Sequence, residues 1–277
     1  MALTPAQQAH LAKLGKNAPG GNLNAELIEK SRAAIADRMY NVKETSNQEL
    51  KILIEEILSD PKCAGCRPAY APPKDRQTAA EKVQRDYGGD WYDLKDVVRA
   101  TIIAPFDAVT RIVQTKIRAL FGLGVGRPGL DIIKDIEVHA GPDPCGYSGM
   151  NFVVRLSSHR PAEIQVNVPV MIYGKEKEKD SKGILGSKQF NEIKSQFMVE
   201  GGYGHTLYEM YRVDKAGPVG QQAAYLSSRY YNSLRGVPRP QTAGELGLEI
   251  RTFMKDPRGY CMKTDSAFLS QTTRGRR

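Results

Sequence analysis

The chain has 277 residues, of which 40% are hydrophobic, and this is enough for one large domain or for one domain with a helical annex. Basic residues outnumber acidic ones by 40 to 31, and the net charge of +9 favours polyanionic partners such as nucleotide phosphates or RNA. No stretch approaches the roughly 20 consecutive apolar residues of a membrane-spanning helix, so we expect no membrane partner and action in the cytoplasm. Secretion or injection into a target cell would need a signal carried outside this chain.

The N-terminal segment is predicted to be helical. Residues 5–15 and 24–58 carry apolar side chains at helical spacing, and a Pro-Gly-Gly sequence at 19–21 separates them. We therefore predict a helical annex over residues 1–60. Residues 60–73, rich in Pro, Ala, Cys and Gly, are predicted to form an irregular loop.

This loop contains the Cys-x-x-Cys pair Cys63 and Cys66, whereas Cys145 and Cys261 are far apart in the sequence. A structural zinc site usually needs four closely spaced ligands, so free thiols are the simplest interpretation. A Cys63–Cys66 disulfide and a zinc site are the alternatives. The small number of cysteines favours a reducing compartment.

The middle of the chain predicts a mixed β-sheet with helices on its faces, in the α/β or α+β class. After a helix that begins near residue 74, a β-branched run indicates a strand, and an amphipathic helix follows it over 106–120. The expected strands of this sheet, which we predict to have about five, include residues 97–104, 132–138, 150–156 and 162–168.

Beyond Pro169 the pattern is helical again, over residues 190–211 and 221–234. The charged run 175–182 is interpreted as a solvated loop or helix end. We predict a main domain over 61–235, followed over 236–277 by an extension rich in Pro and Gly that ends in a basic tail.

Two acidic residues stand at strand ends, where a carboxylate is costly unless it is used. Asp96 opens the strand at 97–104, and Glu163 begins the strand at 162–168 with Gln165 on the same face. Paired carboxylates at neighbouring strand ends, together with substrate phosphates, can hold Mg²⁺. The alternative is a pair of surface acids that form ion pairs with Arg99 or a nearby lysine.

Three cations, Lys74, Arg76 and Lys82, lie on or just before the first turns of the helix that precedes Asp96. If these side chains face a cleft, they can hold a triphosphate. A solvated basic helix face fits the same spacing equally well.

Aromatic and histidine residues mark two further positions. Tyr147 follows a glycine before the strand that carries Asn151, where its ring can stack on a purine or its hydroxyl can be anchored within a loop. His205 and Tyr208 stand in a Gly-His-x-x-Tyr sequence on a predicted helix. Taken alone, His205 is interpreted as a structural histidine.

In this order, the pieces resemble the RelA/SpoT synthetase domain over residues 74–212. The resemblance is carried by Asp96 before an Arg-bearing strand, by Gly146-Tyr147, by the Ala-Glu-Ile-Gln-Val run at 162–166, and by the Gly-His-x-x-Tyr sequence. Residues 163–173 are similar to the variant found in toxin members of this family. The resemblance implies a RelA/SpoT synthetase fold, which is nucleotidyltransferase-like.

The resemblance also implies roles for the candidate residues. Asp96 and Glu163 would hold Mg²⁺, and Glu163 would be the general base, with Gln165 beside it in the catalytic group. The ATP phosphates would be bound by Lys74, Arg76, Lys82 and Arg99. The acceptor nucleotide would be bound by Tyr147 through its base, by Gln165 and Asn151 through its ribose, and by His205 and Tyr208 as supporting residues.

The implied reaction is transfer of the β,γ-pyrophosphate of ATP to the 3'-hydroxyl of a purine nucleotide, which makes (p)ppApp or (p)ppGpp. Gly149 and Asn151 stand where many alarmone synthetases have Ser and His, and this departure, with the toxin-like strand, favours an adenine acceptor. The expected role is that of a growth-inhibiting toxin with a cognate immunity or antitoxin protein. The charge of +9 leaves two alternatives open: pyrophosphorylation of the tRNA 3' end, and a non-catalytic RNA-binding module.

Overall fold

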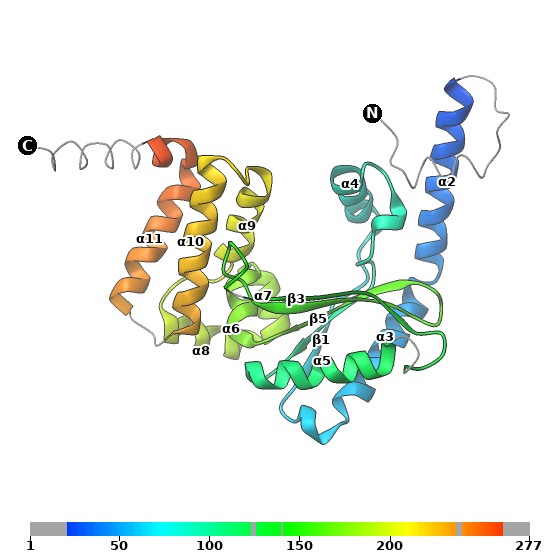
Figure 1. The fold of residues 1–277 in the computed structure, drawn as a ribbon, viewed down its shortest axis with the longest axis horizontal. Coiled ribbons are helices and arrows are strands. Elements are labelled where there is room, and N and C mark those ends of the chain that lie inside the picture. Colours follow the sequence, from blue (N-terminus) through cyan, green and yellow to red (C-terminus); the bar gives the residue numbers. More distant parts are fainter. Residues whose placement is uncertain (1–20, 123–125, 140, 237–239, 263–277) are drawn as a thin grey trace, which may run out of the picture.

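The computed structural model describes residues 21–122, 126–139, 141–236 and 240–262 (Figure 1). The helix expected at residues 5–15 and the basic tail lie outside this part of the chain. Among the helices that are described, none is both long enough and apolar enough to cross a membrane.

The centre of the fold is a five-stranded mixed sheet in the order β1-β2-β5-β4-β3. The β2–β5 pair is parallel and the other pairs are antiparallel. This confirms the predicted mixed sheet flanked by helices. The strands are β1 (Arg67–Tyr70), β2 (Arg99–Ile103), β3 (Asp131–Val138), β4 (Gly149–Arg155) and β5 (Pro161–Asn167).

Strand β1 lies inside the segment 60–73, which was predicted to be an irregular loop, so that part of the prediction is wrong. The strand is only four residues long and contains Pro68, and it pairs with β2 alone at one edge of the sheet. An edge position suits a proline because its missing N–H is not needed on the outer side. The Arg67 guanidinium fixes this edge by donating to the carbonyl oxygens of Ile184 and Leu185, each at 2.9 Å.

One face of the sheet is covered by helices α3 (Lys43–Leu58) and α5 (Asp107–Phe121), which lie below it in Figure 1. Side chains alternate between the two faces of a strand, so Ile164 and Val166 of β5 enter this core while Glu163 and Gln165 point to the opposite face. Helix α3 contributes Leu50 and Ile54 to the same core, and helix α2 (Gly21–Asn41) precedes it.

A second hydrophobic core is built from the helices that follow the sheet. Residues 190–211 were predicted as one helical stretch, but the structure has two helices separated at 198–202. Met198 ends α8 as its C-cap with a positive φ of 53°, and Gly202, with φ of 84°, precedes α9 as its N-cap. The helices are α6 (Pro169–Lys175), α7 (Glu178–Leu185), α8 (Ser187–Phe197), α9 (Tyr203–Val213), α10 (Pro218–Arg235) and α11 (Pro240–Lys255).

Helix α11 occupies much of the segment after residue 235 that was predicted to be an extension rich in Pro and Gly. Leu246, Ile250 and Phe253 recur at helical spacing and are buried in the second core. The glycines and prolines of this region are typical of loops, so they mask the helical spacing of its apolar residues. The proposed division into regions 1–60, 61–235 and 236–277 stays a prediction, although α3 and α11 share cores with the domain between them.

Candidate functional site

The face of the sheet opposite α3 and α5, here called the site face, carries the polar residues of the central strands. In the register of the sheet, Glu163 of β5 lies opposite Arg99 of β2 on one side and Val153 of β4 on the other. Gln165 lies opposite Thr101 and Asn151 in the same way. The parallel β2–β5 pair therefore places the segment that leads into β2 beside Glu163.

That leading segment holds Asp96, which forms the centre of a buried ion cluster. One carboxylate oxygen, Oδ2, accepts from Lys74 Nζ at 2.5 Å and from Lys82 Nζ at 2.8 Å. Lys82 is on helix α4 (Arg76–Tyr87), whose N-terminus is capped by the side chain of Asp75 bonding to the Thr78 N–H. The Lys74 N–H also donates to the Val97 carbonyl at 2.8 Å, which holds the start of α4 against the segment of Asp96.

The electrostatics of this cluster follow from burial and charge together. Burial raises the pKa of Asp96, but the hydrogen bonds and charges of the two lysines outweigh burial, so its pKa lies below the usual value. Lys74 is the more buried lysine and lies near Lys82 and Arg99, so its pKa is lowered despite the bond to Asp96. For Lys82 burial also lowers the pKa, but the charges of Asp96 and Glu163 prevail and raise it.

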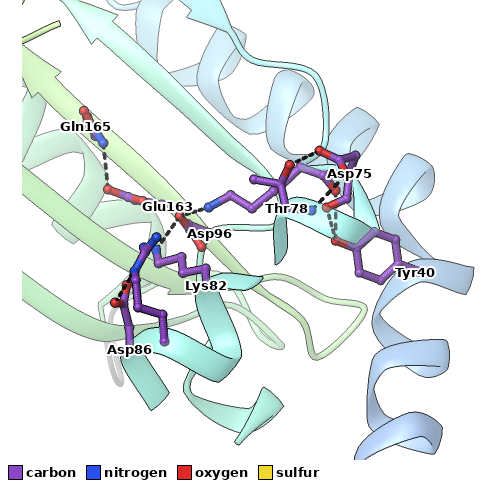
Figure 2. A network of polar contacts seen from close by, with 10 residues as sticks. Tyr40, Asp75, Thr78, Lys82, Asp86, Asp96, Glu163 and Gln165 are labelled. Atoms are coloured by element: carbon purple, nitrogen blue, oxygen red, sulfur yellow. Dashed lines mark hydrogen bonds and ion pairs between the residues drawn. The ribbon is translucent and has the colours of Figure 1, made fainter. Parts of the chain in front are cut away.

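Asp96 and Glu163 thus act on the same ammonium group, and Figure 2 shows their side chains with Lys82 on one side of the sheet. Asp96 Oδ1 is buried and has no hydrogen-bond partner among the described residues. An unpaired buried carboxylate oxygen is costly unless a cation or donor reaches it. The residues present therefore fit a hard cation such as Mg²⁺ held by two carboxylates and a substrate phosphate.

A second line of contacts continues from Glu163 along the site face. Gln165 Nε2 donates to Glu163 Oε1 at 2.8 Å, as Figure 2 shows. Gln165 Oε1 in turn accepts from Lys175 Nζ at 2.9 Å. Lys175, at the end of α6, also lies 3.2 Å from Glu176 Oε1, so it is not the solvated lysine that the charged run 175–182 suggested.

Of the four predicted ATP-binding cations, Arg76 points away from Asp96, whereas Arg99 lies near the Asp96 cluster and, within the described residues, makes no hydrogen bond or ion pair with it. Arg76 Nη2 lies 2.6 Å from Asp37 Oδ1 on α2, and its guanidinium is 5.9 Å from the centre of the Tyr40 ring. Arg99 is exposed on the site face beside Glu163 and affects the pKa of Lys74. The structure brings Lys74, Lys82 and Arg99 together and directs Arg76 toward α2.

The Tyr147 hydroxyl is anchored within the protein, as one of the two interpretations of the sequence expected. It accepts a hydrogen bond of 2.6 Å from Asn167 Nδ2. The ring packs edge-to-face with Tyr231 at 5.6 Å, and Lys175 Nζ lies 5.8 Å from its centre. Stacking of this ring on an acceptor base stays a prediction.

Gly149 is required by the position of Tyr147. A Cβ at Gly149 would lie 2.5 Å from the Tyr147 hydroxyl and 2.9 Å from Asn167 Nδ2. We expect Gly149→Ala to displace this pair and to lower the free energy of unfolding by about 1–3 kcal/mol, as overpacking does. Urea unfolding measures the change. Gly183→Ala is the matched control, because nothing lies within 4 Å of its Cβ and alanine favours a helix; an equal loss of stability in both variants would contradict the account.

The remaining candidates for binding the acceptor are Asn151 on β4 and His205 and Tyr208 on α9. Asn151 is opposite Gln165, and its Oδ1 is buried with no hydrogen-bond partner in the described part of the chain. Tyr208 is partly exposed on α9, and burial with the nearby Asp143 and Cys145 raises its pKa, although Arg212 opposes the rise. His205 is about half exposed and lies 4.0 Å from Glu209 of its own helix. Their roles stay predictions.

An ion pair between α9 and α4 could not be foreseen from the sequence. Arg212 Nη2 lies 2.6 Å from Glu209 Oε2 and 3.9 Å from Asp86 Oδ1 on α4. Both helices lie on the site face, as Figure 1 shows. The link joins the two sides of the site, but charged surface residues at this spacing carry no recognisable signal in a sequence.

The four cysteines, Cys63, Cys66, Cys145 and Cys261, are free thiols in the structure. Within the described ranges, no group of three or more His, Cys, Asp or Glu side chains gathers in a way that could hold a metal ion.

Comparisons with known proteins identify relatives of this chain. No family model matches it. The (p)ppApp synthetase toxin Tas1 of Pseudomonas aeruginosa (strain UCBPP-PA14) is 38% identical over 172 residues, which make up 62% of this chain. The match covers 36% of Tas1, so the chain spans about a third of the length of this curated relative.

Solved structures agree with the sequence match. In the crystal structure of the complex between the type VI effector Tas1 and its immunity protein, the matching chain is 31% identical with a TM-score of 0.60. That match covers 74% of this chain and 97% of the other. The small alarmone synthetase 1 from Bacillus subtilis bound to its product pppGpp matches with a TM-score of 0.41 and 17% identity, over 72% of this chain and 93% of that one. The chain therefore belongs to the RelA/SpoT-type family of alarmone synthetases that includes Tas1, as the resemblance in its sequence implied.

Proposed function

We propose that this protein is an ATP-dependent pyrophosphokinase that transfers the β,γ-pyrophosphate of ATP to the 3'-hydroxyl of a purine nucleotide. The observation that carries the proposal is the placement of Asp96, Lys74 and Lys82 beside Glu163 on one face of the sheet. Membership of the alarmone synthetase family is the reason for assigning pyrophosphoryl transfer, rather than another reaction, to this arrangement.

The residues of the site divide the work between charge neutralisation and proton removal. Lys74, Lys82 and Arg99 supply the positive charge that an ATP triphosphate needs, and they lie on the same face as the carboxylates. Mg²⁺, held by Asp96 and Glu163, would neutralise charge that develops on the transferred phosphates. Glu163 would take the proton of the acceptor hydroxyl as it attacks the β-phosphate, and AMP would leave. Holding both nucleotides in line lowers the barrier by about 7–11 kcal/mol in favourable cases.

An adenine nucleotide is the preferred acceptor, so the expected product is (p)ppApp. The relative Tas1 is named a (p)ppApp synthetase, and Gly149 and Asn151 depart from the common acceptor pattern of the family. The test is to incubate the purified protein and Mg²⁺ with ATP labelled in its β-phosphate and with AMP, ADP, GDP or GTP in turn. Labelled 3'-pyrophosphate on the adenine acceptors supports the proposal, and no labelled product in any tube contradicts it.

The depressed pKa of Lys74 gives the reaction a distinctive alkaline limit. Because burial lowers this pKa, Lys74 loses its proton at lower pH than an ordinary lysine, whose pKa is 10.5. We expect the KM for ATP to rise several-fold at alkaline pH, and to do so at a lower pH than deprotonation of an ordinary lysine would cause, since a neutral amine binds phosphate poorly. Lys74→Arg keeps its charge at this pH and should abolish the rise. An identical pH profile of KM in wild type and variant would exclude Lys74 as the titrating group.

Transfer to the tRNA 3' end and non-catalytic RNA binding stay predictions from the net charge of +9. Two further arms of the assay address them. Label transfer to bulk tRNA that is lost on removal of the terminal adenosine would favour tRNA as the acceptor. Growth inhibition by a Glu163→Gln variant that equals that of wild type would favour a binding module.

The biological role that we propose is that of a growth-inhibiting effector with a cognate immunity protein. The relative Tas1 is a type VI effector whose complex with its immunity protein has been solved. Delivery into a target cell would follow the same route. Expression of this chain should arrest growth and deplete adenine nucleotides, and co-expression of a binding immunity protein should restore both.

A further inference from the structure

Lys175 occupies a position that no surface lysine would take. It is the last residue of α6, the short helix that follows the strand carrying Glu163 and Gln165. Its side chain is only 21% exposed. Its ammonium group contacts Gln165, Glu176 and the Tyr147 ring. A buried ammonium is costly without compensation. Burial lowers the pKa of Lys175, but Tyr147, Glu176 and Glu163 outweigh burial and raise it, so the group is charged at neutral pH.

The chemistry of its neighbours fixes how the Gln165 amide is oriented. An ammonium group only donates hydrogen bonds and a carboxylate only accepts them. The amide atom that faces Lys175 must therefore be the oxygen, and the atom that faces Glu163 must be the nitrogen. Lys175 and Glu163 thus select the same amide orientation from opposite ends, and without the ammonium group the amide oxygen loses the donor that anchors it.

We propose that Lys175 is a positioning residue for the reaction: it holds the Gln165 amide so that Gln165 in turn holds the Glu163 carboxylate toward the acceptor hydroxyl. This inference rests on the proposed pyrophosphoryl transfer, with Glu163 as its base. Among the described residues, Lys175 donates its hydrogen bond to Gln165 and not to the ion cluster of Asp96, Lys74 and Lys82, which is proposed to bind ATP. We therefore assign Lys175 to the part of the site that is proposed to bind the acceptor.

The ammonium group also acts on Glu163 through space, since the two groups interact electrostatically. Loss of Lys175 should therefore misalign the base.

The test compares Lys175→Met with wild type in steady-state kinetics. We expect kcat to fall by roughly 10- to 100-fold, as a misplaced reacting group causes, with the KM for ATP unchanged. Lys175→Arg, which keeps charge and donors, should restore part of kcat. Lys179→Met, an exposed lysine of the same charged run, is the control and should match wild type.

A second measurement does not depend on activity. The side-chain amide signals of Gln165, assigned with Gln165→Glu in ¹⁵N-labelled protein, should be shifted by its two hydrogen bonds in wild type and return toward free-amide values in Lys175→Met. The same signals in wild type and in Lys175→Met would overturn the proposal, as would an unchanged kcat in Lys175→Met. If wild type makes no product with any acceptor, pyrophosphoryl transfer fails, while the amide signals still decide whether Lys175 holds Gln165.

Discussion

Glu163→Gln should abolish pyrophosphoryl transfer while leaving the fold and ATP binding in place. The substitution keeps the size of the side chain and removes the carboxylate that β5 places beside the Asp96 cluster on the site face. Loss of general base catalysis alone costs about 10²–10⁴-fold in rate. Loss of a carboxylate ligand for Mg²⁺ adds to this effect.

The measurement is the initial rate with labelled ATP and ADP, together with ATP binding by calorimetry and a thermal unfolding curve. Glu192→Gln, an exposed glutamate of α8, is the matched control and should keep full activity. A Glu163→Gln enzyme within threefold of the wild-type rate would remove Glu163 from the mechanism. A variant that fails to bind ATP would instead assign Glu163 mainly to the metal.

Asp96→Asn should damage both stability and activity, because Asp96 neutralises two lysines at once. Its carboxylate is 10% exposed, and Lys74 and Lys82 both donate to one of its oxygens. Breaking a buried ion pair from one side typically costs about 3–5 kcal/mol, since the partner charge is left uncompensated. The activity should also fall by at least about a hundredfold, because Asp96 is one of the two carboxylates proposed to hold Mg²⁺.

The pH dependence of this loss has a defined sign. The pKa of Asp96 is lowered in the folded protein, so its contribution to stability is present above the unfolded pKa of about 3.9 and is lost as the pH falls through the lower folded value. The difference in unfolding free energy between wild type and Asp96→Asn should therefore be full at neutral pH and shrink in strong acid. Asp93→Asn, an exposed aspartate three residues away, should show no such difference. An equal stability of Asp96→Asn and wild type at pH 7 would contradict the ion cluster.

Much of the fold was predictable because its elements follow simple periods. The β-branched run of β2, the alternation in β5 and the amphipathic pattern of α5 each specify both an element and a buried face. Strand β1 was missed because four residues with a central proline look like a loop, and its pairing with β2 comes from contacts distant in sequence. Helix α11 was missed because glycine and proline content outweighed its apolar spacing.

The site was predictable where local pattern decides geometry. Glu163 and Gln165 could be placed on one face because side chains alternate along a strand. Asp96 could be placed only near the start of β2, because it precedes the strand and alternation does not apply there. Lys175 could not be placed, because its direction depends on how the short helix α6 packs back against the sheet. The sequence grouped Arg76 with Lys74 and Lys82. In the structure, Arg76 lies at the start of α4 and forms an ion pair with Asp37 of α2 instead. Helix spacing gives no information on such tertiary partners.

The central claim is that Asp96 and Glu163 share one metal ion with the bound triphosphate. A crystal structure of the protein with a non-hydrolysable ATP analogue and Mn²⁺, with data collected at the manganese absorption edge, tests it most directly. The account predicts one strong anomalous peak between the two carboxylates and the phosphates, with Asp96 Oδ1 among the ligands. A metal ion bound to the phosphates with neither carboxylate in contact would contradict it.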